Sequence, residues 1–443
     1  MRLELILEYT LANAEWWTMS AIARCSLETE IGARFRTVRR RTITICEPLT
    51  AEDMMVQSTP EASPLKWHLA HTAWFFESFV LREYLPGYRP FNADFVWLFN
   101  SYYESFAKFP EKRLRSSFSR PPLEEVLRYR EHVDQGIEAL LGRNPESEAL
   151  IRIELGLNHE EQHQELMLTD ILHAFFTNPL RPAYLQFAED FSPAAAPKMD
   201  HTSLSFEGFA GGLREVGHSG EGFAFDNEAP RHKVWMGPYR LAKRLVTCGE
   251  FAAFMEDGGY RRAEFWLSAG WVAVQNNGWR APLYWTSEAG DWSVFTLRGE
   301  QPLARMKTAP VSHVSYFEAD AYARWAGSRL ATEFEWEASA EDRPVEGNLY
   351  ESGRLMPAPT ELSQGPAQLF GDCWQWTASA YLGYPGFRPL GGSLGEYNGK
   401  FMSGNMVLKG GSCVTPASHV RASYRNFFAP ETRWQFSGIR LAS

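Results

Sequence analysis

The character of the sequence changes at residues 188–203, and this change limits what the chain can fold into. Before this segment, long stretches carry apolar residues at the spacing of helices. After it, glycine and tryptophan become dense and helical patterns become short. The segment itself is rich in proline and alanine and has no periodicity, which is typical of a linker. Because 443 residues exceed one ordinary core, we expect two domains joined by this linker.

Four long helical patterns fill the first domain, at residues 26–49, 63–85, 119–142 and 147–176. The second opens on Ser-Pro and the third closes on Gly142, and both are signals of helix ends. Helices of about 20 residues joined by loops predict a four-helix bundle, whose core is a frequent place for metal sites. We assign this bundle to residues 27–187 and treat residues 1–26 as an N-terminal extension.

The second domain, residues 204–443, is predicted to be α+β with much irregular structure. In this domain only residues 314–327 and 332–340 show strong helical patterns. The chain's aromatic content of 14%, with 16 tryptophans, is high enough to supply the aromatic core that long loops need. The predicted fold class is therefore α plus α+β, a helical bundle followed by a loop-rich domain.

The composition argues against several classes of partner. With 44 basic and 54 acidic residues, the net charge of −10 disfavours binding to nucleic acid or to an acidic membrane surface. No run of about 18 uncharged apolar residues predicts a transmembrane helix, and the N-terminus lacks the basic region of a signal peptide. Five scattered cysteines without a CxxC pair suggest a reducing compartment. We expect a cytoplasmic protein, and no sequence feature defines its oligomeric state.

The motif NHEEQHQE at residues 158–165 places His159 and His163 four residues apart. On a helix these side chains project from one face and can occupy adjacent positions on one metal ion. A solvated helix face that carries two histidines is an equal alternative from spacing alone. Gln162 lies within one turn of both, either as a hydrogen-bonding group for a bound ligand or as a surface glutamine.

A third ligand is expected from another helix, and the motif KWHLAHTAWFFE offers His68 and His71. Their spacing of three residues does not separate the two candidates, although aromatic residues follow His71. Three neutral imidazoles would leave metal positions open, which favours chemistry over a purely structural ion. Zn, Ni and Fe(II) all fit this ligand type.

The long connection after the second helix carries two pairs of candidate residues. Tyr102 and Tyr103 would supply a phenolic proton donor near a metal, or pack in an interface, which is the more common role. Arg113 and Arg115 would either clamp a carboxylate or decorate a solvated loop.

Near the C-terminus, Asn426, Phe427 and Phe428 are predicted to lie in a loop, where binding residues concentrate. Together with Trp434, the two phenylalanine rings could form part of a box for a quaternary ammonium group. Core packing is the more frequent role of such aromatic residues.

The motifs of both domains together resemble one known family. HLAHTAWFFE and NHEEQHQE resemble the three-histidine site of DinB-like bundles. In the second domain, PVSHVSYFEADAYARWAG, FGDCWQWTASAY and GGSCVTPASHVRASYRNFF resemble the C-type-lectin-like domain of formylglycine-generating enzymes. The fusion of these two domains looks like the ergothioneine-biosynthesis sulfoxide synthases, the EgtB family. This resemblance spans nearly the whole chain.

The resemblance implies a non-heme Fe(II) enzyme that uses O2 to join a thiol to hercynine, the Nα-trimethylated histidine. The sulfur is attached to imidazole C2 and is oxidised to the sulfoxide. The first-domain tyrosines resemble a branch that accepts free cysteine. The implied site residues are His71, His159 and His163 for iron, Tyr102 and Tyr103 for proton donation, and Gln162, Arg113 or Arg115, Asn426, Phe427 and Phe428 for the substrates. Some members have Asn-Trp-Asp at the last motif, so the loss of the acid at Phe428 suggests different thiol handling.

The same motifs leave other functions open. Within this fold, a selenoneine synthase would use hercynine with a selenosugar, and an ovothiol-type enzyme would use plain histidine and cysteine. From other classes, a DinB-type thiol transferase would use Zn or Ni without oxygen chemistry, and a binding module would not be catalytic. Formylglycine generation is not expected, because Cys413 stands alone where that chemistry needs a cysteine pair.

Overall fold

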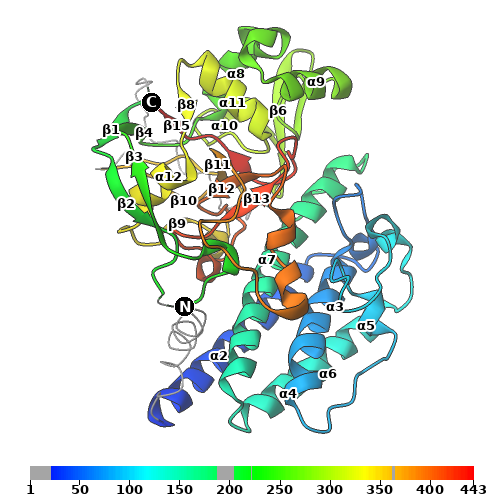
Figure 1. Ribbon diagram of the computed structural model, residues 1–443. Coiled ribbons are helices and arrows are strands. Elements are labelled where there is room, and N and C mark those ends of the chain that lie inside the picture. Colours follow the sequence, from blue (N-terminus) through cyan, green and yellow to red (C-terminus); the bar gives the residue numbers. More distant parts are fainter. Residues whose placement is uncertain (1–20, 187–203, 221, 362–364) are drawn as a thin grey trace. The chain divides into compact units, whose positions relative to one another are not determined.

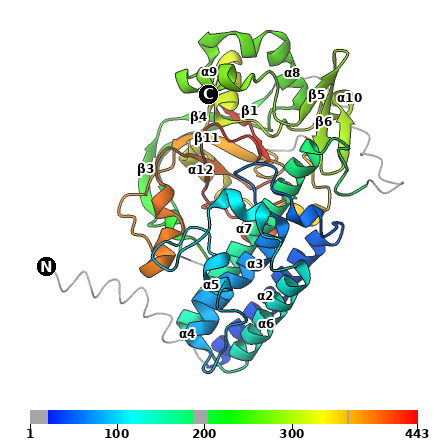
Figure 2. The same cartoon turned by 90° about the vertical axis from the view of Figure 1, so that its right-hand side faces the viewer.

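The computed structural model describes residues 21–186, 204–220, 222–361 and 365–443 (Figures 1 and 2). The chain divides into two compact units, Met1–Met167 and Leu168–Ser443, which are called unit 1 and unit 2 below. The predicted linker, and residues 1–20 of the predicted extension, lie outside the described residues. Within the described ranges, no helix is both long and apolar enough to cross a membrane.

From residue 21 onward, where the structure describes unit 1, it contains four long helices, as the helical patterns predict. They are α2 (Ala21–Cys46), α3 (Leu65–Phe76), α6 (Leu123–Leu141) and α7 (Ser147–Thr177), whose last turns belong to unit 2. α3 and α6 begin directly after a proline, whose fixed φ suits the start of a helix. Shorter elements in the connections are η2 (Asp53–Met55), α4 (Arg82–Tyr84), α5 (Phe95–Leu98) and η4 (Lys112–Ser117).

The core of unit 1 is built around α3, all of whose residues are buried. A helix that is apolar on every side must be enclosed by its neighbours. α3 continues into a π-helical turn, η3 (Glu77–Leu81), and packs against α6. α7 approaches closely enough that a Cβ on Gly156 would lie 2.5 Å from the ring of Phe76. Glycine is therefore required where α7 crosses this aromatic core.

In the described residues of unit 2, short strands form five small sheets. One sheet has the order β1 (Phe206–Phe209), β4 (Tyr239–Ala242), β15 (Leu441–Ala442), β8 (Arg329–Leu330). A second has the order β13 (Asn426–Phe428), β12 (Met406–Lys409), β11 (Trp374–Ala380), β14 (Ser437–Gly438). The remaining strands are β5 (Trp285–Glu288), β6 (Asp291–Thr296) and β7 (Gly299–Pro302), and the pairs β2 (Gly212–Val216) with β3 (His232–Met236) and β9 (Gly347–Asn348) with β10 (Phe370–Gly371).

The helices of unit 2 include both predicted ones, α11 (Tyr316–Trp325) and α12 (Glu333–Ala340). Each begins with a capping box in which a serine or threonine and a glutamate satisfy the free backbone N–H groups. The expectation that these are the only strong helices is wrong, because α8 (Cys248–Glu256) and α9 (Ser268–Asn277) are equally long, and a short α10 (Leu303–Met306) follows. The apolar residues of α8 and α9 do not stand out by their spacing from those of the surrounding loops.

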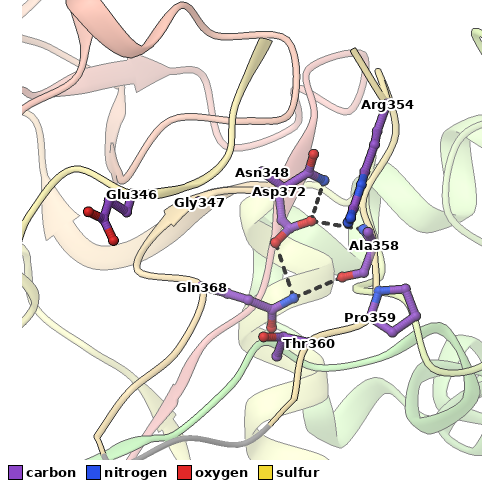
Figure 3. A pocket seen from close by; sticks show the side chains of 9 residues that line it. All are labelled: Glu346, Gly347, Asn348, Arg354, Ala358, Pro359, Thr360, Gln368 and Asp372. Atoms are coloured by element: carbon purple, nitrogen blue, oxygen red, sulfur yellow. Dashed lines mark hydrogen bonds between the residues drawn. The ribbon is translucent and has the colours of Figure 1, made fainter. Parts of the chain in front are cut away.

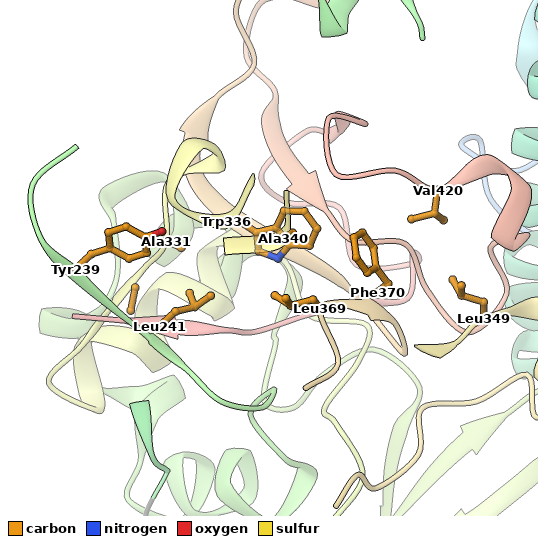
Figure 4. Packing of buried hydrophobic residues seen from close by; sticks show 10 residues of the cluster. Tyr239, Leu241, Ala331, Trp336, Ala340, Leu349, Leu369, Phe370 and Val420 are labelled. Atoms are coloured by element: carbon orange, nitrogen blue, oxygen red, sulfur yellow. The ribbon is translucent and has the colours of Figure 1, made fainter. Parts of the chain in front are cut away.

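One cluster of buried side chains in unit 2 is partly aromatic and includes residues of the first sheet and of α12 (Figure 4). Tyr239 and Leu241 of β4 pack in the same cluster as Trp336 of α12 and Phe370 of β10. The rings of Trp336 and Phe370 meet edge to face, with centroids 5.7 Å apart. A compact aromatic cluster therefore joins segments that are distant in the sequence.

Candidate metal centre and its surroundings

Three histidines of unit 1 meet in the core of the bundle. His71 of α3 and His159 and His163 of α7 each offer a ring nitrogen, and these atoms all lie within 4.8 Å of one another. Their exposed fractions are 0%, 2% and 9%. The alternative of a solvated histidine face is therefore wrong, and this set of neutral nitrogen donors fits a metal ion such as Zn, Ni or Fe(II).

The structure shows which of His68 and His71 belongs to the candidate metal centre. Their spacing in the sequence does not. The Nδ1 atom of His71 lies 2.7 Å from the backbone oxygen of Phe99, so its Nε2 atom points to the centre, 3.2 Å from Nε2 of His159. His68 instead contacts His163, with 2.7 Å between the two Nδ1 atoms. His71 is thus in the group of three, and His68 lies directly behind one of its members.

Burial holds the three imidazoles in the form that binds metals. Burial, with a smaller contribution from His68, lowers the pKa of His159 to about 3 against the opposing charge of Glu160. Burial and the neighbouring histidines also lower the pKa values of His71 and His163 well below the usual range. Since a metal ion binds neutral imidazole, no proton has to be displaced from these rings at neutral pH.

A neighbouring face of α7 holds the helix in place through buried charges. Glu160 accepts hydrogen bonds from Arg39 of α2 and Arg130 of α6, both at 2.8 Å, and from Thr42 at 2.6 Å. Burial opposes ionisation of this carboxyl, but the two arginines outweigh it and lower the pKa of Glu160 to about 2. Glu161 forms a further ion pair with Arg34 at 2.9 Å. The acidic residues of NHEEQHQE therefore fix the helix that carries the histidines.

Two tryptophans of α3 enclose His71 between their rings. Trp67 stacks on His71 with a centroid distance of 4.4 Å, and Trp74 stacks on its other side at 5.2 Å. These residues share one helix face because they are four and three positions from His71. Trp67 was not singled out from the sequence, although this spacing on a helix with a candidate ligand is the signal that would have found it.

The structure distinguishes the two candidate arginines. Arg115 is 3% exposed, and its guanidinium carbon lies 3.4 Å from the ring centroid of Trp67. Its nitrogen atoms donate to Ser63 Oγ at 2.8 Å and Ser101 Oγ at 3.1 Å. The side chain of Arg113 is 68% exposed and pairs with Glu111 at 2.5 Å. Of the two arginines, only Arg115 therefore packs against a ring that is stacked on His71.

The predicted tyrosine pair lies next to Trp74, one of the two rings stacked on His71. Asn100 accepts a hydrogen bond from the backbone N–H of Tyr103 at 3.2 Å and donates to its carbonyl oxygen at 3.1 Å. This turn buries Tyr103 fully, with its ring 5.6 Å from that of Trp74, and Tyr102 stacks on Tyr103 at 4.7 Å. One tryptophan ring thus separates Tyr103 from His71. Gln162, which is partly exposed, lies on the helix face that carries His159.

In unit 2, Asn426, Phe427 and Phe428 form strand β13, and the expectation of a loop is wrong. β13 is the edge strand of its sheet and pairs with β12 over its full length, a contact that periodicity over three residues does not reveal. Successive side chains of a strand point to opposite faces. Accordingly, Phe427 stacks on Tyr381 at 4.0 Å, whereas Phe428 packs against Trp434 at 5.0 Å. The two phenylalanines therefore do not form one wall together.

Unit 2 also contains a polar cavity of about 340 Å³ (Figure 3). At its centre Asp372 accepts hydrogen bonds from Asn348 Nδ2 at 2.7 Å, the backbone N–H of Ala358 at 2.8 Å and Gln368 Nε2 at 3.2 Å. Burial raises the pKa of Asp372 to about 6. Both carboxylate oxygens are already engaged by the protein, so this cavity is a weaker candidate than the histidine centre.

Each of the two units matches a known domain family. Residues 34–167 match the DinB superfamily, and residues 193–363 and 359–443 match the sulfatase-modifying factor enzyme 1-like domain. A hercynine oxygenase of Mycolicibacterium smegmatis is 32% identical over 451 residues, which cover 95% of this chain and 99% of that protein. The hercynine oxygenase of Mycobacterium tuberculosis is 31% identical over 440 residues, covering 93% of this chain and 98% of the relative.

A more distant relative covers part of the chain. Ergothioneine biosynthesis protein 1 of Schizosaccharomyces pombe is 26% identical over 231 residues, which are 49% of this chain and 27% of the fission-yeast protein. The bacterial relatives match both units in one alignment, and each unit matches the corresponding domain family. The chain, a DinB-like bundle with a three-histidine centre joined to a sulfatase-modifying-factor-like domain, belongs to the hercynine oxygenase family.

Proposed function

We propose that this protein is an Fe(II)- and O2-dependent sulfoxide synthase that joins the sulfur of cysteine to C2 of the hercynine imidazole. The observation that carries the proposal is the buried three-histidine centre in a chain that is 32% identical, over nearly its whole length, to a hercynine oxygenase. The reaction balances as hercynine, cysteine and O2 giving the sulfoxide and water. One C–H bond and one S–H bond are lost, and one C–S and one S–O bond form.

His71, His159 and His163 would hold the iron. When bound, Fe(II) would activate O2 and leave open positions for the two organic substrates. The chain's own residues must then keep thiol and imidazole in contact, because correct orientation removes much of the entropic barrier to a reaction between two molecules. The stacked rings of Trp67 and Trp74 support this task, since they fix the plane of His71.

Arg115 is the residue that we assign to the carboxylate of cysteine. Its guanidinium is held flat on Trp67 and is fixed by Ser63 and Ser101, so little side-chain entropy is lost when an anion binds. Arg113 is exposed and paired with Glu111, so we do not assign it to the substrate. Gln162 is assigned to the imidazole of hercynine, because it is partly exposed and follows His159 by three positions.

Tyr103 and Tyr102 are assigned to proton donation during sulfur oxidation. The turn that Asn100 holds keeps Tyr103 buried beside Trp74, and Tyr102 is stacked on it and partly exposed. A phenol is protonated at neutral pH and can therefore donate from its Oη atom.

The amino-acid end of hercynine is assigned to β13. The trimethylammonium group is attracted to aromatic faces, and each face of β13 offers one ring pair. Phe427 with Tyr381 provides one, and Phe428 with Trp434 provides the other. Asn426 shares the Phe428 face, since strand residues two apart point the same way.

The test is an aerobic assay of the Fe(II)-loaded full chain, analysed by mass spectrometry. Hercynine is offered with cysteine, γ-glutamylcysteine and a selenosugar in competition, and a parallel reaction offers histidine with cysteine. The proposal predicts a hercynine–cysteine sulfoxide as the main product. A selenium adduct or a histidine–cysteine product would replace the substrates proposed here. No adduct and no oxygen uptake would favour a Zn- or Ni-dependent transferase or a binding module.

A further inference from the structure

The fourth histidine of the bundle core has no role in the proposed reaction so far. His68 of α3 is 2% exposed, and its Nδ1 atom lies 2.7 Å from Nδ1 of His163. Two ring nitrogens at this distance are joined by an N–H···N hydrogen bond, in which one ring donates and the other accepts. His68 therefore touches a proposed metal ligand without being a member of the group of three.

We infer that His68 is a positioning residue that orients His163, so that Nε2 of His163 faces the metal centre. This inference rests on the proposed metal site but not on the identity of the substrates. With Nδ1 of His163 engaged by His68, Nε2 is the nitrogen left for a metal. In the metal-bound form, Nδ1 of His163 carries the proton and donates it to Nδ1 of His68.

The arrangement around His71 supports this assignment by analogy within the same site. There the backbone oxygen of Phe99 contacts Nδ1 at 2.7 Å, and Nε2 faces the centre. His71 and His163 thus each have a hydrogen-bond partner at Nδ1, at equal distance. Outer partners of this kind fix both the tautomer and the ring orientation of a metal-binding histidine.

The two outer partners differ in one chemical respect. The Phe99 carbonyl can only accept, so it permanently sets His71 in the tautomer with a proton on Nδ1. His68 can accept or donate, so the hydrogen bond to His163 survives when His163 carries its proton on either nitrogen. His68 would therefore hold His163 in place both before and after a metal binds, which keeps the centre preformed.

The experiment measures metal affinity in His68→Leu and His68→Gln, with His71→Ala as the reference for a lost ligand. Co(II) is used as the probe, with affinity from competition against a chelator and geometry from its visible d–d bands. Leucine removes the acceptor at similar volume, and we expect about 10- to 100-fold weaker Co(II) binding. The glutamine carbonyl can still accept from Nδ1 of His163, so most of the affinity should return.

Two results would overturn the inference. If His68→Leu binds Co(II) as tightly as the wild type with an unchanged spectrum, His68 does not position a ligand. If His68→Leu and His68→Gln both lose the metal as fully as His71→Ala, with the band pattern of a missing nitrogen, His68 is itself a ligand. Circular dichroism checks that the variants fold. Loss of affinity in a protein that forms no sulfoxide would sustain this inference while the proposed function fails.

Discussion

The two faces of α7 carry polar residues that alternate in the sequence but act in opposite ways. On one face Glu160 and Glu161 form ion pairs with arginines of the neighbouring helices, and these pairs fix α7 in place. On the other face His159 and His163 converge with His71, and no carboxylate belongs to this group. The comparison teaches that ion pairs on one face of α7 can hold the helix so that its two histidines meet His71 of α3.

The largest effect is expected from breaking the histidine face. Replacing His159 or His163 with alanine should abolish stoichiometric metal binding and lower turnover by at least ~1000-fold, because the remaining ligands cannot hold the reactive centre. The measurements are metal content by mass spectrometry and product formation with hercynine and cysteine. Turnover that survives either substitution would contradict the assignment of the centre.

Breaking the charged face should affect stability first. Glu160→Gln leaves Arg130 buried without its carboxylate and leaves Arg39 with Asp134 alone, and should destabilise unit 1 by about 3–5 kcal/mol. Urea unfolding followed by circular dichroism measures this loss. The control is Glu138→Gln, since Glu138 pairs with Arg36 at the surface and should contribute under about 1 kcal/mol. Equal effects of the two substitutions would show that the charged face does not hold α7.

The wild type and Glu160→Gln should also differ in how their stability depends on pH. The pKa of Glu160 is lowered from 4.5 to about 2 in the folded chain. A depressed carboxyl pKa stabilises the fold above the unfolded value, and this contribution is lost as pH falls through the folded value. The stability difference between wild type and Glu160→Gln should therefore be full above pH 4.5 and shrink toward pH 2. A stability difference between the two proteins that grows on acidification would contradict this prediction.

A smaller effect should separate the two arginines near the histidine face. Arg115→Ala should raise KM for cysteine by about 10- to 100-fold, the loss of a charge-assisted contact with its carboxylate. Arg113→Ala, at an exposed position two residues away, should change KM by less than about twofold. Steady-state kinetics at saturating hercynine distinguish them. Equal KM values for the two variants would remove Arg115 from the thiol site.

The smallest expected effect is on KM for hercynine when residues of β13 are replaced. Like α7, this strand has two faces with different contacts. Since Phe427 and Phe428 point to opposite faces, hercynine should depend on one of them. Replacing that residue with alanine should raise KM for hercynine by about 3- to 30-fold, the range of a cation–π contact. The other variant should leave KM near that of the wild type. If both raise KM equally, the substrate does not discriminate the faces of β13.

The helices of unit 1 could be predicted because long apolar periods and proline starts are local signals. The pairing of His159 with His163 followed from the same helical spacing. Helical spacing does not distinguish His68 from His71, because the orientation of His71 depends on the carbonyl of Phe99, which a loop brings back to α3; only the family resemblance selected His71. The choice of Arg115 over Arg113 likewise depends on how a short 3-10 turn, η4, is oriented.

In unit 2, helical patterns predicted α11 and α12 but not α8. A capping box begins all three helices, at Thr247 and Glu250 in α8, but this signal was not used for the prediction. β13 was predicted as a loop because a strand of three residues exists only through its partner β12. Elements that depend on non-local pairing are invisible to periodicity.

The most direct test of the central claim is the metal content and oxygen uptake of the purified chain. The claim is that the histidine face of α7, together with His71, forms a redox-active iron centre. The account predicts one Fe(II) per chain, lost in His159→Ala, and oxygen consumption that requires hercynine and cysteine together. Tightly bound zinc, with no oxygen consumed in the presence of both substrates, would contradict it.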